Sequence, residues 1–370
     1  MNKITSLYLD FLRVIAAFGV LMVHSSLYQF SNNMFLHQEM GHKLVMIFFV
    51  LSGFLIAYSV SAKNKNFKTY TIDRLSRLYS VVIPALIFTY LIDGVGSYIN
   101  PTLYSQEVAP DNQLVRALMN FAFIQQIWGF CSKPSSNGVF WSISYEFWYY
   151  FLFGIFSYLA GYKRILLLLV VCFIVGLKIL LLLPVWIMGV ICFNYSDKIK
   201  INKVIAAIIF IASSILIIYL GFFYHSAFLG AGEQEGHGRA PLFFSTFYLF
   251  DWFYGGLVAI NIFSLNAIKI SEISFNKIPS FVIESIRYLS SITFTLYLFH
   301  WPLLLFVGAV VPYNKGDYMQ LIPLIVLVVI CIAGIASFTE KKRGFYKNIL
   351  EVIFAFVERN LKLHNKTKEA

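Results

Sequence analysis

Two ionisable side chains stand in the first apolar stretch of the chain, where a bilayer disfavours charge. Arg13 and His24 lie on one face of a predicted helix, because their spacing is about 20° past three full turns and about 16 Å along the axis. Ionisable groups inside a span are costly and indicate function by default. Small side chains on the same face, Ala16, Ala17 and Val20, leave room for a neighbouring helix or a thin ligand. The alternative is structural: Arg13 extends to the headgroups and His24 bonds another helix.

A basic group precedes the third apolar stretch. Arg74 and Arg77 are one helical turn apart and are expected to face the same way. Two guanidinium groups on the same side of a helix can each form bidentate hydrogen bonds with phosphate oxygens, which predicts a site for a phosphorylated ligand. The neighbouring Lys63, Lys65 and Lys68 fit ordinary anchoring at the cytoplasmic surface, which is also the alternative for the arginines.

Glu146 lies five residues into an aromatic-rich apolar segment that begins at Trp141. A carboxylate there is expensive unless it is paired or protonated. Its depth, about 7 Å below the outer boundary by helical rise, is similar to that of His24 in a core of roughly 30 Å. We therefore expect Glu146 to orient His24 as a base, as acyl transfer to a hydroxyl requires. A hydrogen bond that merely bridges two helices is the alternative.

His300 lies near the middle of the ninth apolar stretch, two residues before Pro302. The proline loosens the backbone, and nearby hydroxyls can satisfy the groups it frees. The pattern favours a structural role for His300, with a chemical role as the alternative. The chain has no Gly-x-Ser-x-Gly elbow, and its four cysteines show neither paired nor metal-ligand spacing. This argues against a Ser or Cys acyl-enzyme and predicts no metal site, but an acylated histidine stays open.

Composition identifies the solvent in which these groups must be positioned. The chain has 370 residues, is 59% hydrophobic and has only 13% charged residues, with a mean hydropathy of +0.73. Soluble domains carry roughly 25% charged residues, so a soluble interaction module is excluded. Apolar runs of the length that a bilayer core demands predict an all-α polytopic membrane protein of about ten helices. The predicted spans are Phe11–Phe30, Leu44–Val60, Leu78–Ile92, Trp141–Leu159, Ile165–Leu177, Ile179–Phe193, Val204–Tyr224, Leu242–Phe263, Ser290–Val311 and Leu321–Thr339.

Charge distribution sets the predicted topology. With both termini in the cytoplasm, about four fifths of the 29 lysines and arginines fall inside, as the positive-inside rule requires. The formal charge of +11 then reflects topology and anionic lipid rather than nucleic acid. The loop Lys63–Arg77 is predicted to be cytoplasmic and Gly230–Arg239 to be extracytoplasmic. Leu114–Phe130 is a further span or a re-entrant piece; as a span, it would merge the fifth and sixth into one.

Five short motifs, taken in order, resemble the bacterial family-3 membrane acyltransferases, which O-acetylate surface polysaccharides and similar acceptors. Each is weak alone, but together they cover the chain from about Tyr8 to Thr339. The motifs are Leu9-Asp10-Phe11-Leu12-Arg13 with His24 after it, Phe48-Phe49-Val50-Leu51-Ser52-Gly53-Phe54, Arg74-Leu75-Ser76-Arg77, Trp141-Ser142-Ile143-Ser144-Tyr145-Glu146, and Leu296-Tyr297-Leu298-Phe299-His300-Trp301-Pro302.

The resemblance implies ten spans in a bacterial inner membrane, an acyl-CoA donor bound from the cytoplasm, and a hydroxyl acceptor on a carbohydrate. It implies functional roles for Arg13 and His24 and donor contacts for Arg74 and Arg77. We expect residues 1–340 to form this domain and 341–370 a basic cytoplasmic tail. Two features depart from the family: Pro84 comes late after the arginine pair, and the C-terminal hydrolase-like domain of some members is not seen.

The hypothesis that follows is a membrane O-acyltransferase, with acetyl the first choice of acyl group. The CoA phosphates would bind Arg74, Arg77 and Arg13, the pantetheine would follow the small face of the first helix, and His24 would take the acceptor proton. No tightly bound cofactor is expected. The rival is a transporter or flippase for a lipid-linked sugar, which would also keep buried ionisable groups. We find no inverted repeat between the halves, which counts against the rival.

Overall fold

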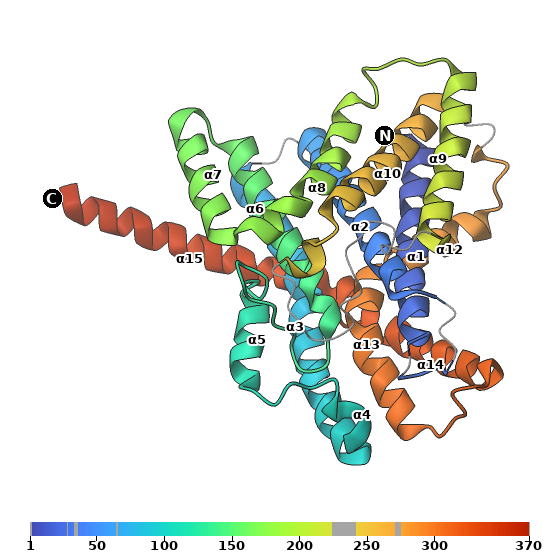
Figure 1. Cartoon of the computed structure of the whole chain (residues 1–370). Coiled ribbons are helices and arrows are strands. Elements are labelled where there is room, and N and C mark those ends of the chain that lie inside the picture. Colours follow the sequence, from blue (N-terminus) through green and yellow to red (C-terminus); the bar gives the residue numbers. More distant parts are fainter. Residues whose placement is uncertain are drawn as a thin grey trace.

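The computed structural model describes residues 2–27, 29–32, 36–63, 66–223, 242–270 and 275–369. Within these ranges the regular secondary structure is helical (Figure 1). The helices are α1 (Lys3–Ser25), α2 (Gln38–Lys63), α3 (Phe67–Ile99), α4 (Pro101–Ser105), α5 (Gln113–Phe121), α6 (Trp141–Tyr158), α7 (Gly161–Val175), α8 (Leu177–Tyr195), α9 (Lys203–Phe223), α10 (Tyr248–Ile268), α12 (Ser280–Ser290), α13 (Thr293–Val310), α14 (Tyr318–Ala336) and α15 (Arg343–Glu369), with short 3-10 turns η1 (Gly138–Phe140), η3 (Phe243–Ser245) and η4 (Glu340–Lys342).

Eight helical stretches in the described ranges are long and apolar enough to cross a membrane. They are α1, α2, α3, α8, α9, α10, α13 and the stretch that begins with α14. Two more of the ten predicted spans fold as α6, which is rich in Tyr, Trp and Ser, and α7, which has 15 residues. The protein is therefore an all-helical, multi-pass membrane protein. The predicted extracytoplasmic segment Gly230–Arg239 lies outside the described residues.

The first helix begins earlier than predicted. Asn2 caps α1 by accepting a hydrogen bond of 2.6 Å from the backbone N–H of Thr5, a common way to satisfy a helix start. The helix therefore runs from Lys3 to Ser25 rather than from Phe11 to Phe30. Arg13 consequently lies near the middle of α1 rather than near its cytoplasmic end, and His24 lies in its last turn.

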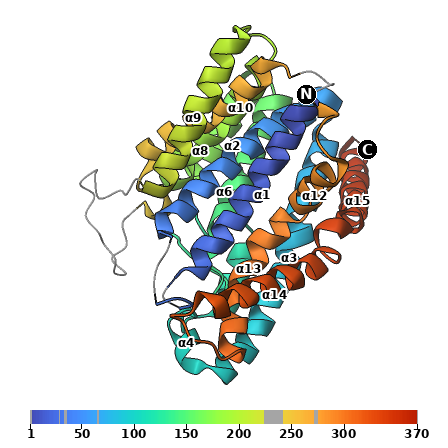
Figure 2. The same ribbon diagram turned by 90° about the vertical axis from the view of Figure 1, so that its right-hand side faces the viewer.

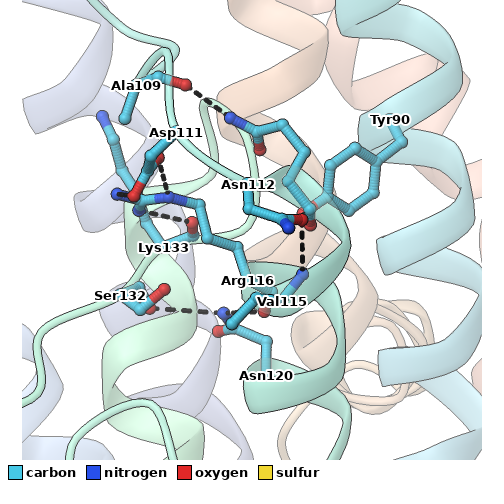
Figure 3. Close-up of polar contacts among 10 residues, drawn as sticks. Tyr90, Ala109, Asp111, Asn112, Val115, Arg116, Asn120, Ser132 and Lys133 are labelled. Atoms are coloured by element: carbon cyan, nitrogen blue, oxygen red, sulfur yellow. Dashed lines mark hydrogen bonds and ion pairs between the residues drawn. The ribbon is translucent and has the colours of Figure 1, made fainter.

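The stretch Leu114–Phe130 is not a spanning helix. Helix α5 ends at Phe121 and has nine residues, too few to cross a core of roughly 30 Å at about 1.5 Å per residue. Figure 3 shows the polar contacts that fix this segment: Asn112 caps α5, and Arg116 bonds Asp111 at 2.5 and 2.7 Å. The hydrogen-bonded Arg116 guanidinium lowers the pKa of the Asp111 carboxyl below its ordinary value. The alternative in which this stretch is a span and α7 and α8 are one helix is therefore wrong.

The break between α7 and α8 falls at Gly176, which has a φ of +77°. Side chains other than glycine rarely adopt this conformation. A Cβ here would also meet Trp128 at 3.0 Å. Helix α8 begins at Leu177 and continues through Pro184, so the proline does not interrupt it.

Helices α2 and α13 occupy the centre of the bundle. Helix α2 packs against α1, α8 and α10, and α13 packs against α1, α3 and α14 (Figure 2). The α2–α8 contact is close enough to require glycine on both helices. A Cβ on Gly53 would meet the Trp186 carbonyl oxygen at 2.0 Å, and one on Gly189 would meet the Val50 carbonyl oxygen at 2.0 Å. This contact explains Gly53 in the second motif.

The C-terminal segment forms a long helix, α15. Helix α15 extends away from the bundle (Figure 1) after contacting the first part of α3. Arg343 donates a hydrogen bond of 2.8 Å to the Asp73 carbonyl oxygen, and Lys347 lies 3.2 Å from the Asp73 carboxylate. Lys68 and Glu358 form a further ion pair at 2.8 Å. These contacts attach the C-terminal helix beside the arginine motif.

Candidate active site

Two neighbouring cavities contain most of the candidate residues. The histidine cavity, of about 250 Å³, is lined by His24 from α1, His42 from α2, Trp301 from α13 and loop residues including Glu107 and Lys133. The arginine cavity, of about 60 Å³, is lined by residues that include Arg13, Ser52, Arg77 and Glu146. Tyr297 and Val45 line both cavities. The predicted site residues are thus divided between two adjoining spaces.

His24 is paired with His300. The Nδ1 atom of His24 lies 2.6 Å from Nε2 of His300, and Nδ1 of His300 lies 3.0 Å from the Leu296 carbonyl oxygen. A carbonyl only accepts, so His300 carries its proton on Nδ1 and accepts the Nδ1–H of His24 at Nε2. The Nε2 atom of His24 is then unprotonated, and it has no hydrogen-bond partner among the described residues. The last turn of α1 and its contact with His300 of α13 thus leave the Nε2 lone pair of His24 free.

The expected pair of His24 and Glu146 is wrong. The Glu146 carboxylate accepts hydrogen bonds from the hydroxyls of Ser52, at 2.9 Å, and Tyr150. Tyr150 is four residues after Glu146 and therefore lies on the same face of α6. Equal depth along the bilayer normal does not determine direction around a helix, and α6 directs Glu146 into the arginine cavity. The residue that orients the His24 ring is His300, for which the sequence pattern favoured a structural role.

Arg13 and Arg77 line the arginine cavity together with the carboxylate of Glu146. Arg13 lies 3.8 Å from Asp10, which also accepts a 2.8 Å hydrogen bond from Ser290. The guanidinium group of Arg77 forms no hydrogen bond or ion pair with any described residue. A guanidinium group has five N–H donors, so this cavity holds more donors than the protein itself uses. Such an arrangement suits an anionic ligand.

Arg74 does not share this cavity. Its Nη2 atom donates a 3.2 Å hydrogen bond to Ser59, and its guanidinium lies about 6 Å from the ring centres of Tyr70 and Tyr150. It lines a separate groove with Phe67. Arg74 and Arg77 therefore do not line the same cavity, although they are one helical turn apart.

The partition between the cavities is the side chain of Tyr297. Its hydroxyl lies 2.9 Å from the Ser142 hydroxyl and donates to the Val139 carbonyl at 3.2 Å. On the small face of α1, Ala16 and Ala17 are fully buried and line neither cavity, whereas Val20 lines the histidine cavity. The two cavities adjoin where α2 and α13 meet.

Sequence reasoning missed a second histidine pair. His42 lines the histidine cavity, and its Nε2–H donates to Oδ1 of Asp251 at 3.0 Å. Asp251 is fully buried in the first turn of α10, where the helix N-terminus favours a carboxylate. Asp251 lies inside a predicted span, so the rule that marked Arg13 and His24 would also have identified it.

The rim of the histidine cavity is polar. Lys133 lies 3.3 Å from Glu107, which accepts a 2.7 Å hydrogen bond from Gln29. Among the described residues, no group of three His, Cys, Asp or Glu side chains is placed to hold a metal ion. The site therefore offers imidazoles, guanidiniums and hydroxyl partners for chemistry.

Comparison with known proteins identifies the family. The model of the acyltransferase domain of family 3 matches residues 6–339. No curated protein and no solved structure matches the chain. The chain belongs to acyltransferase family 3.

Proposed function

We propose that this membrane acyltransferase transfers an acyl group, acetyl first among candidates, from acyl-CoA to a carbohydrate hydroxyl. The acceptor is a cell-surface or lipid-linked glycan, and the membrane is the bacterial inner membrane. The observation that carries the proposal is the pair of adjoining cavities. One offers guanidiniums without hydrogen-bonded partners, and the other offers the free Nε2 of His24. This arrangement fits a donor with several phosphates and a reactive thioester at opposite ends.

The donor phosphates bind Arg77 and Arg13 as charge-assisted hydrogen bonds. The acyl end passes Tyr297 and reaches His24, so the Tyr297 side chain must rotate during each turnover. An imidazole with one nitrogen protonated and the other free is suited to acyl transfer to a hydroxyl. His300 maintains that state by accepting the Nδ1–H of His24. In this scheme Glu146 lines the cavity that binds the donor phosphates and takes no part in orienting His24.

We further propose ten spans, which are the eight long apolar helical stretches together with α6 and α7. Both termini then lie in the cytoplasm. The positive-inside distribution supports this orientation, as does the division of the cavities: the histidine cavity is lined by the α4–α6 connection and the arginine cavity by the arginine motif. In a chain whose four cysteines are replaced by serine, an impermeant thiol reagent applied outside should label Ser105→Cys and spare Lys341→Cys. Labelling of Lys341→Cys alone would reverse the orientation.

The activity itself is tested with purified protein in detergent micelles and acetyl-CoA. The enzyme should release free CoA, and release should accelerate when a membrane glycan extract is added. Mass spectrometry of surface glycans from cells with and without the protein should show the loss of one acetyl group per modified unit. Absence of CoA release with every glycan fraction would favour the transporter.

A further inference from the structure

The pair of His42 and Asp251 is unused by the function proposed so far. His42 lines the same cavity as His24, and its ring stacks on Trp141 at 5.6 Å between centroids, which fixes its plane. The helices that hold the two imidazoles are in contact here: a Cβ on Gly41 would lie 3.4 Å from Val23. A buried carboxylate that orients an imidazole beside a cavity is a common way of building a base.

Two oriented imidazoles exceed the needs of direct transfer. In direct transfer one base takes the acceptor proton and returns it to the departing thiolate. In a two-step transfer one group carries the acyl moiety and a second group activates the acceptor. The histidine cavity contains both kinds of group, each with a separate partner: His300 for His24 and Asp251 for His42.

The free nitrogens of the two rings differ in access. His24 presents Nε2, the nitrogen remote from its Cβ, because Nδ1 is engaged with His300. In His42 the Nε2 atom is hydrogen-bonded to Asp251, so Nδ1 is the free nitrogen. Nδ1 is bonded to the ring carbon that carries Cβ and is therefore more crowded. An acyl group needs space around the nitrogen, whereas a proton does not. The geometry therefore suits His24 to acylation and His42 to proton transfer.

We propose that His24 carries the acyl group and that His42, held by Asp251, is the general base of the second step. First, His24 Nε2 attacks the thioester carbonyl, the C–S bond breaks, and the CoA thiolate leaves and takes a proton from solvent. Then the acceptor hydroxyl attacks the acyl-imidazolium, the N–C bond breaks, and the hydroxyl proton passes to His42. The resulting imidazolium is stabilised by Asp251 and later returns its proton to solvent. This inference rests on the proposed acyltransferase activity.

The test uses acetyl-CoA with a labelled acetyl group and a membrane glycan extract that supplies the acceptor, because wild type can turn over only when the second step has an acceptor hydroxyl. His42→Ala and Asp251→Asn should release one equivalent of CoA per chain and then slow by about 10²-fold or more relative to wild type. Each should retain one acetyl group, which peptide mapping places on His24. His24→Ala should show neither the burst nor the label. Asp73→Asn, which alters a buried carboxylate that lines neither cavity, is the matched control and should behave as wild type.

Hydroxylamine separates a base from a structural residue, because this strong nucleophile does not need a base to attack an acyl-imidazole. It should restore continuous CoA release in His42→Ala and Asp251→Asn but not in His24→Ala. If these variants show no burst, no acetyl label and no response to hydroxylamine while wild type turns over, the two-step scheme is wrong and the acyltransferase proposal stands. If wild type itself releases no CoA, even when acceptor glycans are supplied, the proposed function fails.

Discussion

The two cavities that share Tyr297 differ in whether their ionisable side chains have hydrogen-bond partners. In the histidine cavity each imidazole is bonded to a partner, His24 to His300 and His42 to Asp251. In the arginine cavity the guanidinium group of Arg77 has no hydrogen-bond partner among the described residues. Groups with fixed partners suit chemistry, since their orientation is set before substrate arrives. Groups without partners suit recognition, because the ligand supplies the missing acceptors. In the function proposed above, this difference assigns catalysis to the histidine cavity and donor binding to the arginine cavity.

The largest effect should come from the histidine cavity. His24→Ala should lower kcat by about 10²–10⁴-fold, as loss of the imidazole that performs the chemistry does. CoA release measured with a thiol reagent gives the rate, and size-exclusion chromatography checks that the variant is folded. Retention of more than about a tenth of the wild-type kcat would place the chemistry elsewhere.

The next effect should come from the arginine cavity and should be of another kind. Arg77→Ala should raise the KM for acetyl-CoA by roughly 10- to 100-fold, since a charge-assisted hydrogen bond contributes about 1.5–3 kcal/mol. The kcat should change little, because the contact is equal in ground and transition states.

Arg74→Ala is the matched control for that variant. Arg74 is bonded to Ser59 and lines a separate groove, so its loss should leave the KM within about twofold of wild type. Equal effects of the two substitutions would restore the original expectation that both arginines bind the donor.

A smaller effect should follow from His300→Phe. The substitution keeps an aromatic ring but removes the acceptor for His24 Nδ1–H, a hydrogen bond worth about 0.5–1.5 kcal/mol. The kcat should fall roughly 2- to 10-fold with KM unchanged. An increase in KM without loss of kcat would show that His300 supports the donor site instead.

The smallest effect should come from Glu146→Gln. The carboxylate is bonded to the hydroxyls of Ser52 and Tyr150, and a glutamine carbonyl can accept in the same way. The kcat should stay within about twofold of wild type. A loss approaching that of His24→Ala would indicate that Glu146 acts on the imidazole during turnover.

The sequence predicted the helical class, and each of the ten predicted apolar segments contains a helix, because both follow from local composition. His24 lines an interior cavity, but its hydrogen-bond partner there is His300 rather than the predicted Glu146. Distances along one helix follow from helical rise, whereas the direction in which Glu146 or Arg74 points depends on packing between helices. His42 was missed because it precedes the apolar run of its helix, and Asp251 was overlooked within a run. Arg74 and Arg77 line different cavities, which their spacing along one helix does not indicate.

Acetyl-CoA binding measured by calorimetry tests most directly whether recognition and chemistry are separate. The separation predicts that His24→Ala, although inactive, binds acetyl-CoA within about twofold of wild type. It predicts that Arg77→Ala binds at least about 10-fold more weakly while keeping its kcat. Equal loss of affinity in both variants, or unchanged affinity in Arg77→Ala, would contradict the assignment of donor binding to the arginine cavity and of chemistry to His24.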